Sequence, residues 1–510
     1  MSVFKMQRYI FAFQQKTKIL SFTRKMSSLM QSKAYINGNW VDALSSETFE
    51  VRNPSNGQVI GTVPNMNADD AQRGIDAANK AFRSSEWAAM TAKQRSCLLK
   101  NWYNLIAENT LEIAEIMTAE SGKPINEAKG EVAYGNSFVE WFAEEARRIY
   151  GEIVPSPIAN RELIIMKAPI GVAALVTPWN FPMAMITRKA GAALAAGCTV
   201  VIKPAEDTPL TALALTRLAE KAGIPKGVMN VITTNKASPV GDLFCKSPDV
   251  AGISFTGSTE VGKLLYRNCA DGIKRLCLEL GGNAPFIVFD TANVEQAVDG
   301  AMVSKFRNCG QTCVSANRFF VQEGIYDKFV EQLKQRVTSL KIGNGNCTDV
   351  QIGPLINRMQ FEKVTAFVED ARSKNANIIA GGKALKEIGE LFYEPTIVTD
   401  VNNAMRLYNE EVFGPVISII KFRTEEEAIK KANNTRRGLA GYFYSENLQQ
   451  VFRVAKRLEV GMIGVNEGLI STAEAPFGGV KESGIGREGS HHGIDDYVDI
   501  KYICLGNLSY

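Results

Sequence analysis

Strand-like and helix-like segments alternate along this 510-residue chain from residue 171 onward, and this alternation restricts the fold more than any other feature. Short apolar runs rich in Val, Ile and Ala are each followed by a stretch of helical character. Strands and helices that alternate in this way form parallel sheets, with ligands at the carboxyl ends of the strands. We therefore predict an α/β fold with strands at Gly171–Thr177, Thr199–Lys203, Val228–Thr233, Ala251–Thr256 and Arg275–Leu280, and helices at Met183–Ala196, Thr208–Ala222, Pro239–Cys245 and Ser258–Cys269.

The alternation restarts after Asn283 and continues to about Tyr444, which predicts a second α/β domain. A chain of this length is expected to form two or three domains. Residues 34–66 predict small strands. Further helices are predicted at Ala68–Phe82, Lys93–Glu108, Leu111–Glu120, Ile125–Tyr150, Val294–Phe306 and Tyr326–Leu340.

Composition limits the possible partners. Nine cysteines, an odd number without CxxC pairs, are typical of reduced thiols and not of a disulfide framework or a zinc site. Seven of the 58 Lys and Arg residues lie in residues 1–33, which hold no Asp or Glu, so the rest of the chain carries 51 basic and 54 acidic side chains. The body of the chain therefore gives no electrostatic reason to expect a nucleic-acid partner, and we predict no metal site.

The first 32 residues have the composition of a targeting segment. They combine Lys, Arg and Ser with apolar residues and lack the continuous apolar run of a secretory signal. We predict a mitochondrial transit peptide over residues 1–32 and a location in the mitochondrial matrix. The alternative is a disordered basic tail, with an internal start at Met26, on a cytoplasmic protein. The longest uncharged run, Ala168–Thr187, contains three prolines and predicts a buried strand leading into a loop, not a membrane span.

Cys313 and Glu279 predict chemistry at a thiol. Cys313 follows Gly310-Gln311-Thr312, a stretch that allows a tight turn and exposes the thiol. A lone cysteine is more often a buried small hydrophobe, so its context decides. Glu279 ends an apolar strand, where burial would raise its pKa toward that of a useful base. The alternative for Glu279 is a salt bridge or a helix cap.

Histidine is nearly absent, which favours a Cys/Glu pair beside a redox cofactor. Thiol nucleophiles usually rely on histidine, and the chain has only His491 and His492, near its C-terminus. Asn180 lies between Pro178 and Pro182, which fix the backbone, so its amide could donate to an oxyanion. The alternative is an ordinary turn asparagine.

Two strand ends predict a nucleotide site. The one literal G-x-G-x-x-G, at residues 484–489, ends too close to residue 510 for a βαβ unit, so we do not interpret it as a nucleotide motif. Phe255–Gly262 instead joins a strand to a helix whose amino end suits a phosphate. Lys203-Pro204-Ala205-Glu206 ends another strand of the same sheet, and its Lys and carboxylate could bind ribose hydroxyls.

Seven ordered motifs make the chain resemble the aldehyde dehydrogenase superfamily over nearly its whole length after residue 32. These motifs are Thr177-Pro178-Trp179-Asn180, Lys203-Pro204-Ala205-Glu206, Phe255-Thr256-Gly257-Ser258, Glu279-Leu280-Gly281-Gly282, Gly310-Gln311-Thr312-Cys313, Glu411-Val412-Phe413-Gly414-Pro415 and Pro476-Phe477-Gly478-Gly479. The resemblance implies Cys313 as nucleophile, Glu279 as base, and an oxyanion hole from Asn180 and the Cys313 N–H. It implies NAD as cofactor, bound by Trp179, Lys203, Pro204, Ala205, Glu206, Gly257, Ser258, Thr259, Gly262, Leu280, Glu411 and Phe413.

The resemblance also implies a domain organisation. It places a Rossmann-type NAD-binding domain at residues 34–150 and 170–281 and a catalytic α/β domain at residues 282–485. A small oligomerisation element is implied at residues 151–169 and 486–510, so we expect a homo-oligomer, either a tetramer or a dimer.

Three stretches are most similar to the succinate-semialdehyde dehydrogenase branch of the superfamily. They are Ile186–Lys189, Ser304–Asn308 and Asn466–Ser471. This similarity implies that Arg188, Arg307 and Ser471 bind the terminal carboxylate of a small aldehyde, a reasonable charge-assisted clamp. Taken singly, the two arginines could instead form surface or interdomain salt bridges. Lys189, next in the sequence, is expected to matter less to the substrate.

One position departs from some relatives, which carry a second cysteine two residues after the nucleophile. Ser315 occupies that position here, and we predict no disulfide between Cys309 and Cys313.

We predict the NAD-dependent oxidation of succinate semialdehyde to succinate, as in 4-aminobutanoate degradation. The close alternative is a dehydrogenase of glutarate semialdehyde or of broader aliphatic aldehydes. A catalytically silent binding protein is the alternative of another class, and the intact Cys313, Glu279 and Asn180 argue against it. A thiol hydrolase would need a nearby histidine and would lack the nucleotide motifs.

Overall fold

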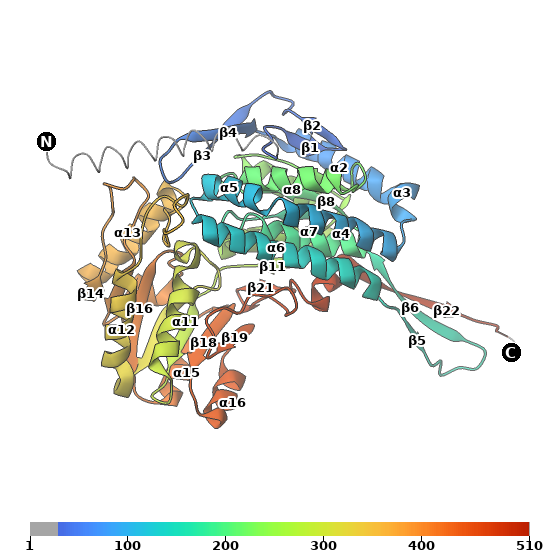
Figure 1. Cartoon of the computed structure of the whole chain (residues 1–510). Coiled ribbons are helices and arrows are strands. Elements are labelled where there is room, and N and C mark those ends of the chain that lie inside the picture. The colour runs from blue at the N-terminus through green and yellow to red at the C-terminus, as the bar shows by residue number, and fades with distance from the viewer. Residues whose placement is uncertain (1–28, 509–510) are drawn as a thin grey trace.

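A sheet of mostly parallel strands organises the first half of the molecule (Figure 1). In the computed structural model, which describes residues 29–508, its strand order is β2-β1-β9-β8-β7-β10-β11-β21. The five central strands of this order, β9-β8-β7-β10-β11, are parallel. When they are numbered as they occur along the chain, their order in the sheet is 3-2-1-4-5, which is the order of a dinucleotide-binding fold. Their bounds are β1 Ala34–Ile36, β2 Asn39–Val41, β7 Val172–Val176, β8 Thr199–Lys203, β9 Met229–Val231, β10 Val250–Thr256, β11 Arg275–Glu279 and β21 Gly484–Ile485. The five strands predicted between residues 171 and 280 are confirmed.

Helices cover both faces of this sheet because successive strand residues point to opposite sides. In β7, Ala173 and Leu175 belong to one apolar core, whereas Val172 and Ala174 belong to the other. The first core is filled by helices α4 Ala92–Glu108, α5 Thr110–Ser121, α6 Ile125–Glu145, α7 Ala184–Ala196 and α8 Pro209–Lys221. The second core is covered by α2 Ala68–Arg83, α9 Ala237–Lys246 and α10 Thr259–Asn268.

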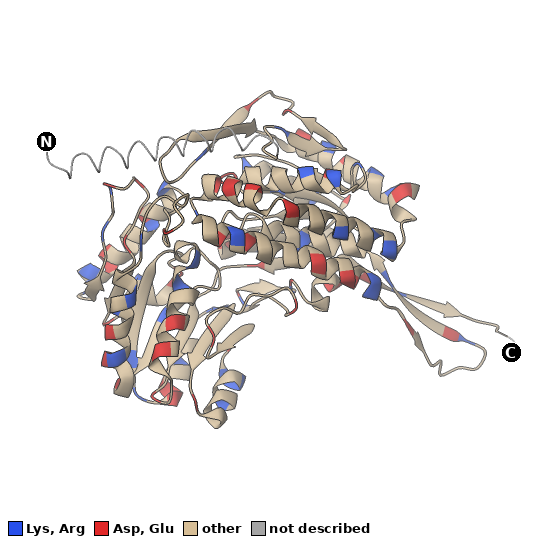
Figure 2. Ribbon diagram, in the orientation of Figure 1, with Lys and Arg blue, Asp and Glu red and all other residues tan. Residues whose placement is uncertain are grey.

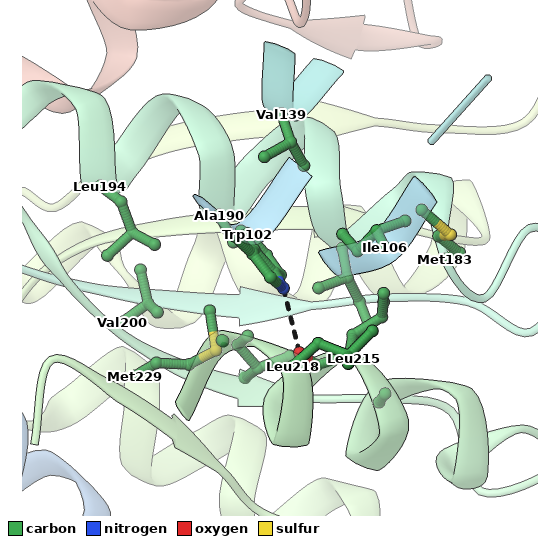
Figure 3. Close-up of a cluster of buried hydrophobic side chains, with 14 of the residues drawn as sticks. Trp102, Ile106, Val139, Met183, Ala190, Leu194, Val200, Leu215, Leu218 and Met229 are labelled. Atoms are coloured by element: carbon green, nitrogen blue, oxygen red, sulfur yellow. Dashed lines mark hydrogen bonds between the residues drawn. The ribbon is translucent and has the colours of Figure 1, made fainter. Parts of the chain in front are cut away.

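Trp102 of α4 lies at the centre of the first core (Figure 3). Its indole N–H donates to the Leu215 carbonyl of α8 at 3.1 Å, so the buried ring has its one polar atom satisfied. The apolar groups of Val139, Leu194 and Met229 surround it from a helix, another helix and a strand. This core therefore joins α4, α6, α7 and α8 to the sheet.

The second half of the chain forms the second α/β unit that the alternation predicts. Its strand order is β14-β15-β16-β13-β12-β18-β19, all parallel except the edge strand β14. The strands are β12 Ala284–Val288, β13 Ala316–Gln322, β14 Asn377–Ala380, β15 Thr396–Thr399, β16 Val416–Phe422, β18 Ala440–Tyr444 and β19 Met462–Val465. The helices are α11 Val294–Phe306, α12 Tyr326–Thr338, α13 Arg358–Ser373, α14 Arg406–Asn409, α15 Glu425–Asn433 and α16 Leu448–Arg457.

A three-stranded antiparallel sheet projects from the body of the molecule (Figure 1). It joins β5 Glu152–Val154 and β6 Glu162–Pro169 to β22 Val498–Leu505, near the end of the chain. Smaller elements are α3 Ser85–Ala88, the pair β3 Thr48–Arg52 and β4 Val59–Pro64, the pair β17 Arg437–Gly438 and β20 Val480–Lys481, and five 3₁₀ turns at Ala146–Arg148, Ala270–Gly272, Arg307–Gly310, Glu323–Ile325 and His491–Tyr497.

Two expectations are refined by the structure. The helix predicted to extend from Ile125 to Tyr150 ends at Glu145 and continues as a short 3₁₀ turn. The stretch at 484–489 begins with the edge strand β21, Gly484–Ile485, which pairs antiparallel with β11 and does not lead into an α-helix as a phosphate loop would. The uncharged run at 168–187 contains the buried strand β7, and no helix in residues 29–508 is long and apolar enough to cross a membrane.

Charged side chains of both signs are interspersed along the helices (Figure 2). Many form ion pairs one helical turn apart or between neighbouring elements, as Arg406 does with Glu410 and Arg453 with Glu425. Exposed pairs of this kind each contribute at most about 1 kcal/mol. The fold therefore depends on its apolar cores more than on its surface charges.

The close packing of α6 on α7 gives a test of these helix assignments. A Cβ added at Gly135 would lie 2.8 Å from the Met183 side chain and 3.2 Å from the Ala184 backbone, so Gly135→Ala is expected to cost about 1–3 kcal/mol of stability. At Gly130, on the same helix, a Cβ has nothing within 4 Å, so Gly130→Ala should add about 0.5–1 kcal/mol through helix propensity. Thermal unfolding midpoints of the two variants should move in opposite directions; movement in the same direction contradicts this packing.

Candidate active site

The candidate active site lies at the carboxyl ends of the first sheet. The strand order reverses between β7 and β10, and a crevice at such a point is where ligands bind in open α/β sheets. Asn180 follows β7, Lys203 ends β8, Ser258 follows β10 and Glu279 ends β11. The fold therefore brings together four predicted residues that are up to a hundred positions apart.

Cys313 reaches this crevice from the second α/β unit on a loop with unusual backbone geometry. After α11 the chain passes through left-handed conformations at Asn308, Cys309 and Gly310, with φ of 53°, 56° and 73°. A side chain at Gly310 would collide with the Gly414 carbonyl, so only glycine fits there. The loop leaves the Cys313 thiol partly exposed, and the Cys309 thiol next to it is buried and free.

Electrostatics around Cys313 oppose ionisation of its thiol. Burial raises the thiol pKa to about 12, and the carboxyls of Glu411 and Glu279 act in the same direction. The guanidiniums of Arg188 and Arg307 lower it in part. A nucleophilic thiolate at this position therefore needs further positive charge or a proton acceptor nearby.

Glu279 is a buried carboxyl without a hydrogen-bond partner. Its side chain is 2% exposed, and neither oxygen is paired with any described residue. Burial raises its pKa well above the ordinary value, and the neighbouring Glu488 raises it further, against the lowering effect of Lys189 and Arg188. The expectation that burial would make this carboxyl a stronger base is confirmed.

The Asn180 side chain has one end fixed and the other available. Its Oδ1 accepts a hydrogen bond from the Phe181 N–H at 3.0 Å. Because that N–H can only donate, the facing atom must be the oxygen, which settles the orientation of the amide. The Nδ2 group has no partner within residues 29–508 and can donate to a ligand.

The predicted cofactor residues line strand ends and the amino end of α10. Lys203 Nζ lies 3.2 Å from the Glu206 carboxylate, and the Ser258 hydroxyl caps α10 by accepting from the Val261 N–H. Buried beside them are Pro204, Ala205 and Thr259. A side chain at Gly257 or Gly262 would collide with the Phe255 ring or with Leu280, so the backbone stays open to a close approach at this helix end.

A second group of predicted cofactor residues comes from the other α/β unit. Glu411 accepts a hydrogen bond from the Gly282 N–H at 3.1 Å, which anchors it to the first unit. The rings of Phe413 and Trp179 meet edge to face, with centroids 5.4 Å apart. A helix amino end, a lysine–carboxylate pair and an apolar wall fit a dinucleotide, whose phosphates, ribose and ring need these groups.

Arg188 has protein partners that the sequence did not indicate. Its guanidinium lies 3.2 Å from the Glu488 carboxylate, hydrogen-bonds the Tyr134 hydroxyl and is only 2% exposed. It also lies over the Phe477 ring, 4.4 Å from the centroid. Lys189 is fully buried and ion-paired with the same Glu488, so it has a structural role; that it matters less than Arg188 to the substrate stays a prediction.

Arg307 differs from Arg188 because its guanidinium is free. It has no ion pair or hydrogen bond to any described residue, and it lies 5.0 Å from the centre of the Phe181 ring. It lies on the turn Arg307–Gly310 that leads to Cys313, and its charge lowers the pKa of the Cys313 thiol. Burial raises the pKa of the Tyr134 hydroxyl, and Arg188, Arg307 and Ser471 act to lower it. The three residues predicted to bind a carboxylate are thus gathered around Tyr134.

Tyr134 and Glu488 are site residues that the sequence did not reveal. Tyr134 is one of many apolar or aromatic residues on a long helix, and no local signal distinguishes it. Glu488 lies inside the G-x-G-x-x-G stretch, where the glycines attract attention instead. Both become recognisable only when the fold brings α6, α7 and the C-terminal segment together.

The fold and this arrangement define an α/β oxidoreductase that binds a nicotinamide dinucleotide, NAD or NADP. The chain belongs to the aldehyde dehydrogenase family: residues 40–503 match the family model described as "Aldehyde dehydrogenase family".

Individual relatives are similar over nearly the whole chain. The Escherichia coli succinate-semialdehyde dehydrogenase [NADP(+)] GabD is 53% identical and the human mitochondrial succinate-semialdehyde dehydrogenase is 53% identical, each over 94% of this chain and over 99% and 90% of the respective relative. A glutarate-semialdehyde dehydrogenase of Pseudomonas aeruginosa is 52% identical over 95% of this chain and 99% of its own length. The crystal structure of succinate-semialdehyde dehydrogenase from Burkholderia pseudomallei superposes with a TM-score of 0.93 at 51% identity, covering 94% of this chain and 99% of that chain.

The raised pKa of Glu279 predicts a pH-dependent gain in stability for Glu279→Gln. An unfolded glutamate has a pKa of about 4.3. Between that pH and the higher pKa of the folded state, the folded protein holds a proton on Glu279 that the unfolded chain has released. Below about pH 4.3 the Glu279 carboxyl does not lower the free energy of unfolding, and as the pH rises toward the folded pKa it lowers that free energy more and more. Glutamine removes this loss, so the thermal midpoint of the variant should exceed that of wild type at pH 8 and approach it near pH 5.

Glu140→Gln is the matched control, because Glu140 is exposed on α6. Its thermal midpoint should follow wild type across the same pH series. A Glu279→Gln midpoint below wild type at pH 8 would show that the Glu279 carboxylate stabilises the fold.

Proposed function

We propose that the protein oxidises succinate semialdehyde to succinate with NAD. The observation that carries this proposal is the Arg307 guanidinium, which lies on the turn that leads to Cys313 and forms no ion pair or hydrogen bond with a described residue. A substrate with an aldehyde at one end and a carboxylate at the other can reach the thiol and the cation together. Tyr134, Ser471 and Arg188 supply further polar groups around the same space.

The first half of the reaction takes place at Cys313. Its sulfur attacks the aldehyde carbon, the thiol proton passes to solvent water, and the carbonyl oxygen becomes an oxyanion. Asn180 Nδ2 and the Cys313 N–H are the donors available to that oxyanion, and one such donor contributes roughly 3 kcal/mol to a barrier. When bound, the dinucleotide accepts the hydride from the former aldehyde carbon, which leaves a thioester on Cys313.

The second half of the reaction is hydrolysis of that thioester, with Glu279 as the base. In its deprotonated form Glu279 takes a proton from water, the hydroxyl adds to the thioester carbon, and the sulfur leaves as a thiolate. A buried carboxyl with a raised pKa is suited to this step, because it binds the proton more strongly than an exposed glutamate does. Glu279 can form this contact because no described residue occupies its oxygens.

Glutarate semialdehyde is the second candidate substrate. It has the same two functional groups separated by one more methylene, and a relative 52% identical to this chain is a glutarate-semialdehyde dehydrogenase. One methylene in an apolar pocket changes selectivity by about 10- to 200-fold, so the two substrates need a direct comparison.

A panel of aldehydes tests this proposal. Wild type should reduce NAD with succinate semialdehyde at a kcat/KM at least about 100-fold above that with butanal, which lacks the carboxylate, because an unpaired buried charge costs about 2–5 kcal/mol. Arg307→Met should lose most of that preference while retaining butanal activity. Cys313→Ala should abolish turnover of every aldehyde.

The controls separate the substrate assignment from the chemistry. Lys305→Met is unsuitable because Lys305 is buried near Glu411, so the exposed Arg336→Met on α12 serves as the charge-matched control and should leave the preference unchanged. If Arg307→Met lowered kcat/KM equally for succinate semialdehyde and butanal, the substrate could be assigned only as an unspecified aldehyde. Persistent activity in Cys313→Ala would remove the thiol from the mechanism.

Glu206 supports a preference for NAD over NADP. Its carboxylate is exposed beside Lys203 at the end of β8, where it can accept from ribose hydroxyls and would repel a 2′-phosphate. The Escherichia coli relative carries NADP(+) in its name, so cofactor choice varies among close relatives.

The cofactor preference is tested by comparing kcat/KM for the two dinucleotides. NAD should be favoured by at least about 10-fold, and Glu206→Gln should narrow the ratio by improving NADP, because a like-charge contact is removed. Glu331→Gln, at an exposed carboxylate on α12 in the second α/β unit, is the control. Equal kcat/KM values for the two cofactors in wild type would contradict this preference.

We also infer that the protein is a homo-oligomer and is located in the mitochondrion, from its three-stranded sheet and from the composition of its first 32 residues. The three-stranded sheet exposes Ile153, Met166, Ile500 and Tyr502, an apolar surface that supports its role in a homodimer or homotetramer. The three larger sheets support the expected division into NAD-binding, catalytic and oligomerisation segments, although β21, from the expected catalytic segment, joins the first sheet. The transit peptide expected at residues 1–32 lies almost wholly outside the described residues, and its composition supports a mitochondrial location.

A further inference from the structure

The main chain of Asn180 is held by two donors that come from different parts of the molecule. Its carbonyl oxygen accepts from Lys123 Nζ at 2.9 Å and from Asn308 Nδ2 at 2.9 Å. Lys123 lies between α5 and α6, and Asn308 lies on the loop that leads to Cys313. The residue that offers the oxyanion donor is thus fixed from both sides of the crevice.

Lys123 belongs to a buried ion pair that also fixes the start of α7. Lys123 and Glu131 are both almost fully buried and in direct contact. The other Glu131 oxygen accepts from the Met183 and Ala184 N–H groups at 3.0 and 3.3 Å, three and four residues after Asn180. A buried ion pair contributes little net stability against its desolvation cost. Here it orients a charge-assisted donor on the Asn180 carbonyl.

Asn308 connects the same carbonyl to the nucleophile loop. Its backbone N–H donates to Glu127 Oε2 at 2.8 Å, and its Nδ2 group donates to Gln311 O at 3.1 Å as well as to Asn180. The left-handed backbone at Asn308 places this amide between the two segments. The two available oxyanion donors, Asn180 Nδ2 and the Cys313 N–H, are therefore linked through one side chain.

We propose that Lys123, with Glu131, and Asn308 are positioning residues for the oxyanion hole. They fix the Asn180 backbone, and the bond from Phe181 N–H to Asn180 Oδ1 then directs Nδ2 toward the reacting oxygen. This inference rests on the proposed function, because it requires Asn180 to stabilise an oxyanion formed on the Cys313 adduct. None of the three residues needs to touch the substrate.

A double-mutant cycle separates positioning from a general effect on the fold. Lys123→Met/Glu131→Gln removes the charged donor without leaving a buried unpaired charge, and Asn180→Ala removes the oxyanion donor. With the aldehyde of the panel that is turned over fastest, each change alone should lower kcat and kcat/KM together by about 10- to 1,000-fold, with KM little changed. When the Lys123/Glu131 change is added to Asn180→Ala, kcat should fall by less than about 3-fold further, because the Asn180 amide that the change would misplace is already absent.

Asn308→Gly gives an independent arm of the cycle. Glycine adopts the left-handed backbone without strain, so this variant removes the two Nδ2 bonds and keeps the loop conformation. Asn308→Gly should likewise lower kcat when it is introduced into the wild type, and it should lower kcat little further when it is introduced into Asn180→Ala. Asn375→Gly, at an exposed left-handed asparagine, and Glu120→Gln, at a buried carboxyl that caps α8, are controls expected to retain kcat.

The outcomes decide separately on the two proposals. The positioning role would be overturned if each change lowered kcat by the same factor in Asn180→Ala as in the wild type. It would also be overturned if kcat were unchanged in both Asn308→Gly and the Lys123/Glu131 variant. Either result would leave the proposed reaction intact. An unchanged kcat in Asn180→Ala itself would overturn the oxyanion hole, and the positioning role with it. If Lys123→Met/Glu131→Gln fails to fold, the Asn308→Gly arm decides alone.

Discussion

The carboxylate of Glu488 holds two buried cations, and the architecture of the active site depends on this interaction. Glu488 pairs with Arg188 and Lys189 of α7, and Lys189 also donates to the Thr256 hydroxyl at the end of β10. The C-terminal segment, a helix and a strand of the first sheet are therefore joined at one point. Removing one member of such a buried cluster leaves an uncompensated charge, which typically costs about 3–5 kcal/mol.

This cluster also explains why Glu279 remains unpaired although cations lie close to it. Arg188 and Lys189 direct their hydrogen bonds to Glu488, so Glu279 receives only their longer-range effect, which the negative charge of Glu488 opposes. A direct ion pair would lower the pKa of Glu279 and make it a poor proton acceptor. Because both cations bind another carboxylate, the buried Glu279 keeps a raised pKa and has no hydrogen-bond partner among the described residues.

Most of the fold could be predicted from the sequence, because local periodicity determines it. The strand–helix alternation predicted the five parallel strands of the first sheet, and the glycine and strand-end motifs selected Cys313, Glu279 and the strand ends of the candidate nucleotide site. What the sequence could not give was the pairing of side chains across distant segments. Arg188 appeared equivalent to Arg307, yet the structure gives Arg188 the partners Tyr134 and Glu488, and the latter is 300 positions away. Such pairs depend on packing geometry, which no local pattern encodes.

The different environments of the two arginines give a physical account of how a carboxylate could be selected. Arg188 shares the Glu488 carboxylate with Lys189 and donates to the Tyr134 hydroxyl, so its hydrogen bonds are largely committed to the protein. Arg307 has the Phe181 ring on one side and no carboxylate in direct contact among the described residues, although its charge acts on the buried Glu127 carboxyl. A partly desolvated cation without a counter-ion is an incomplete ion pair, and a substrate carboxylate would complete it, whereas an uncharged aldehyde would not. Selectivity under the proposed function then arises from a charge that the fold leaves unpaired, while the neighbouring cations are used to hold the site together.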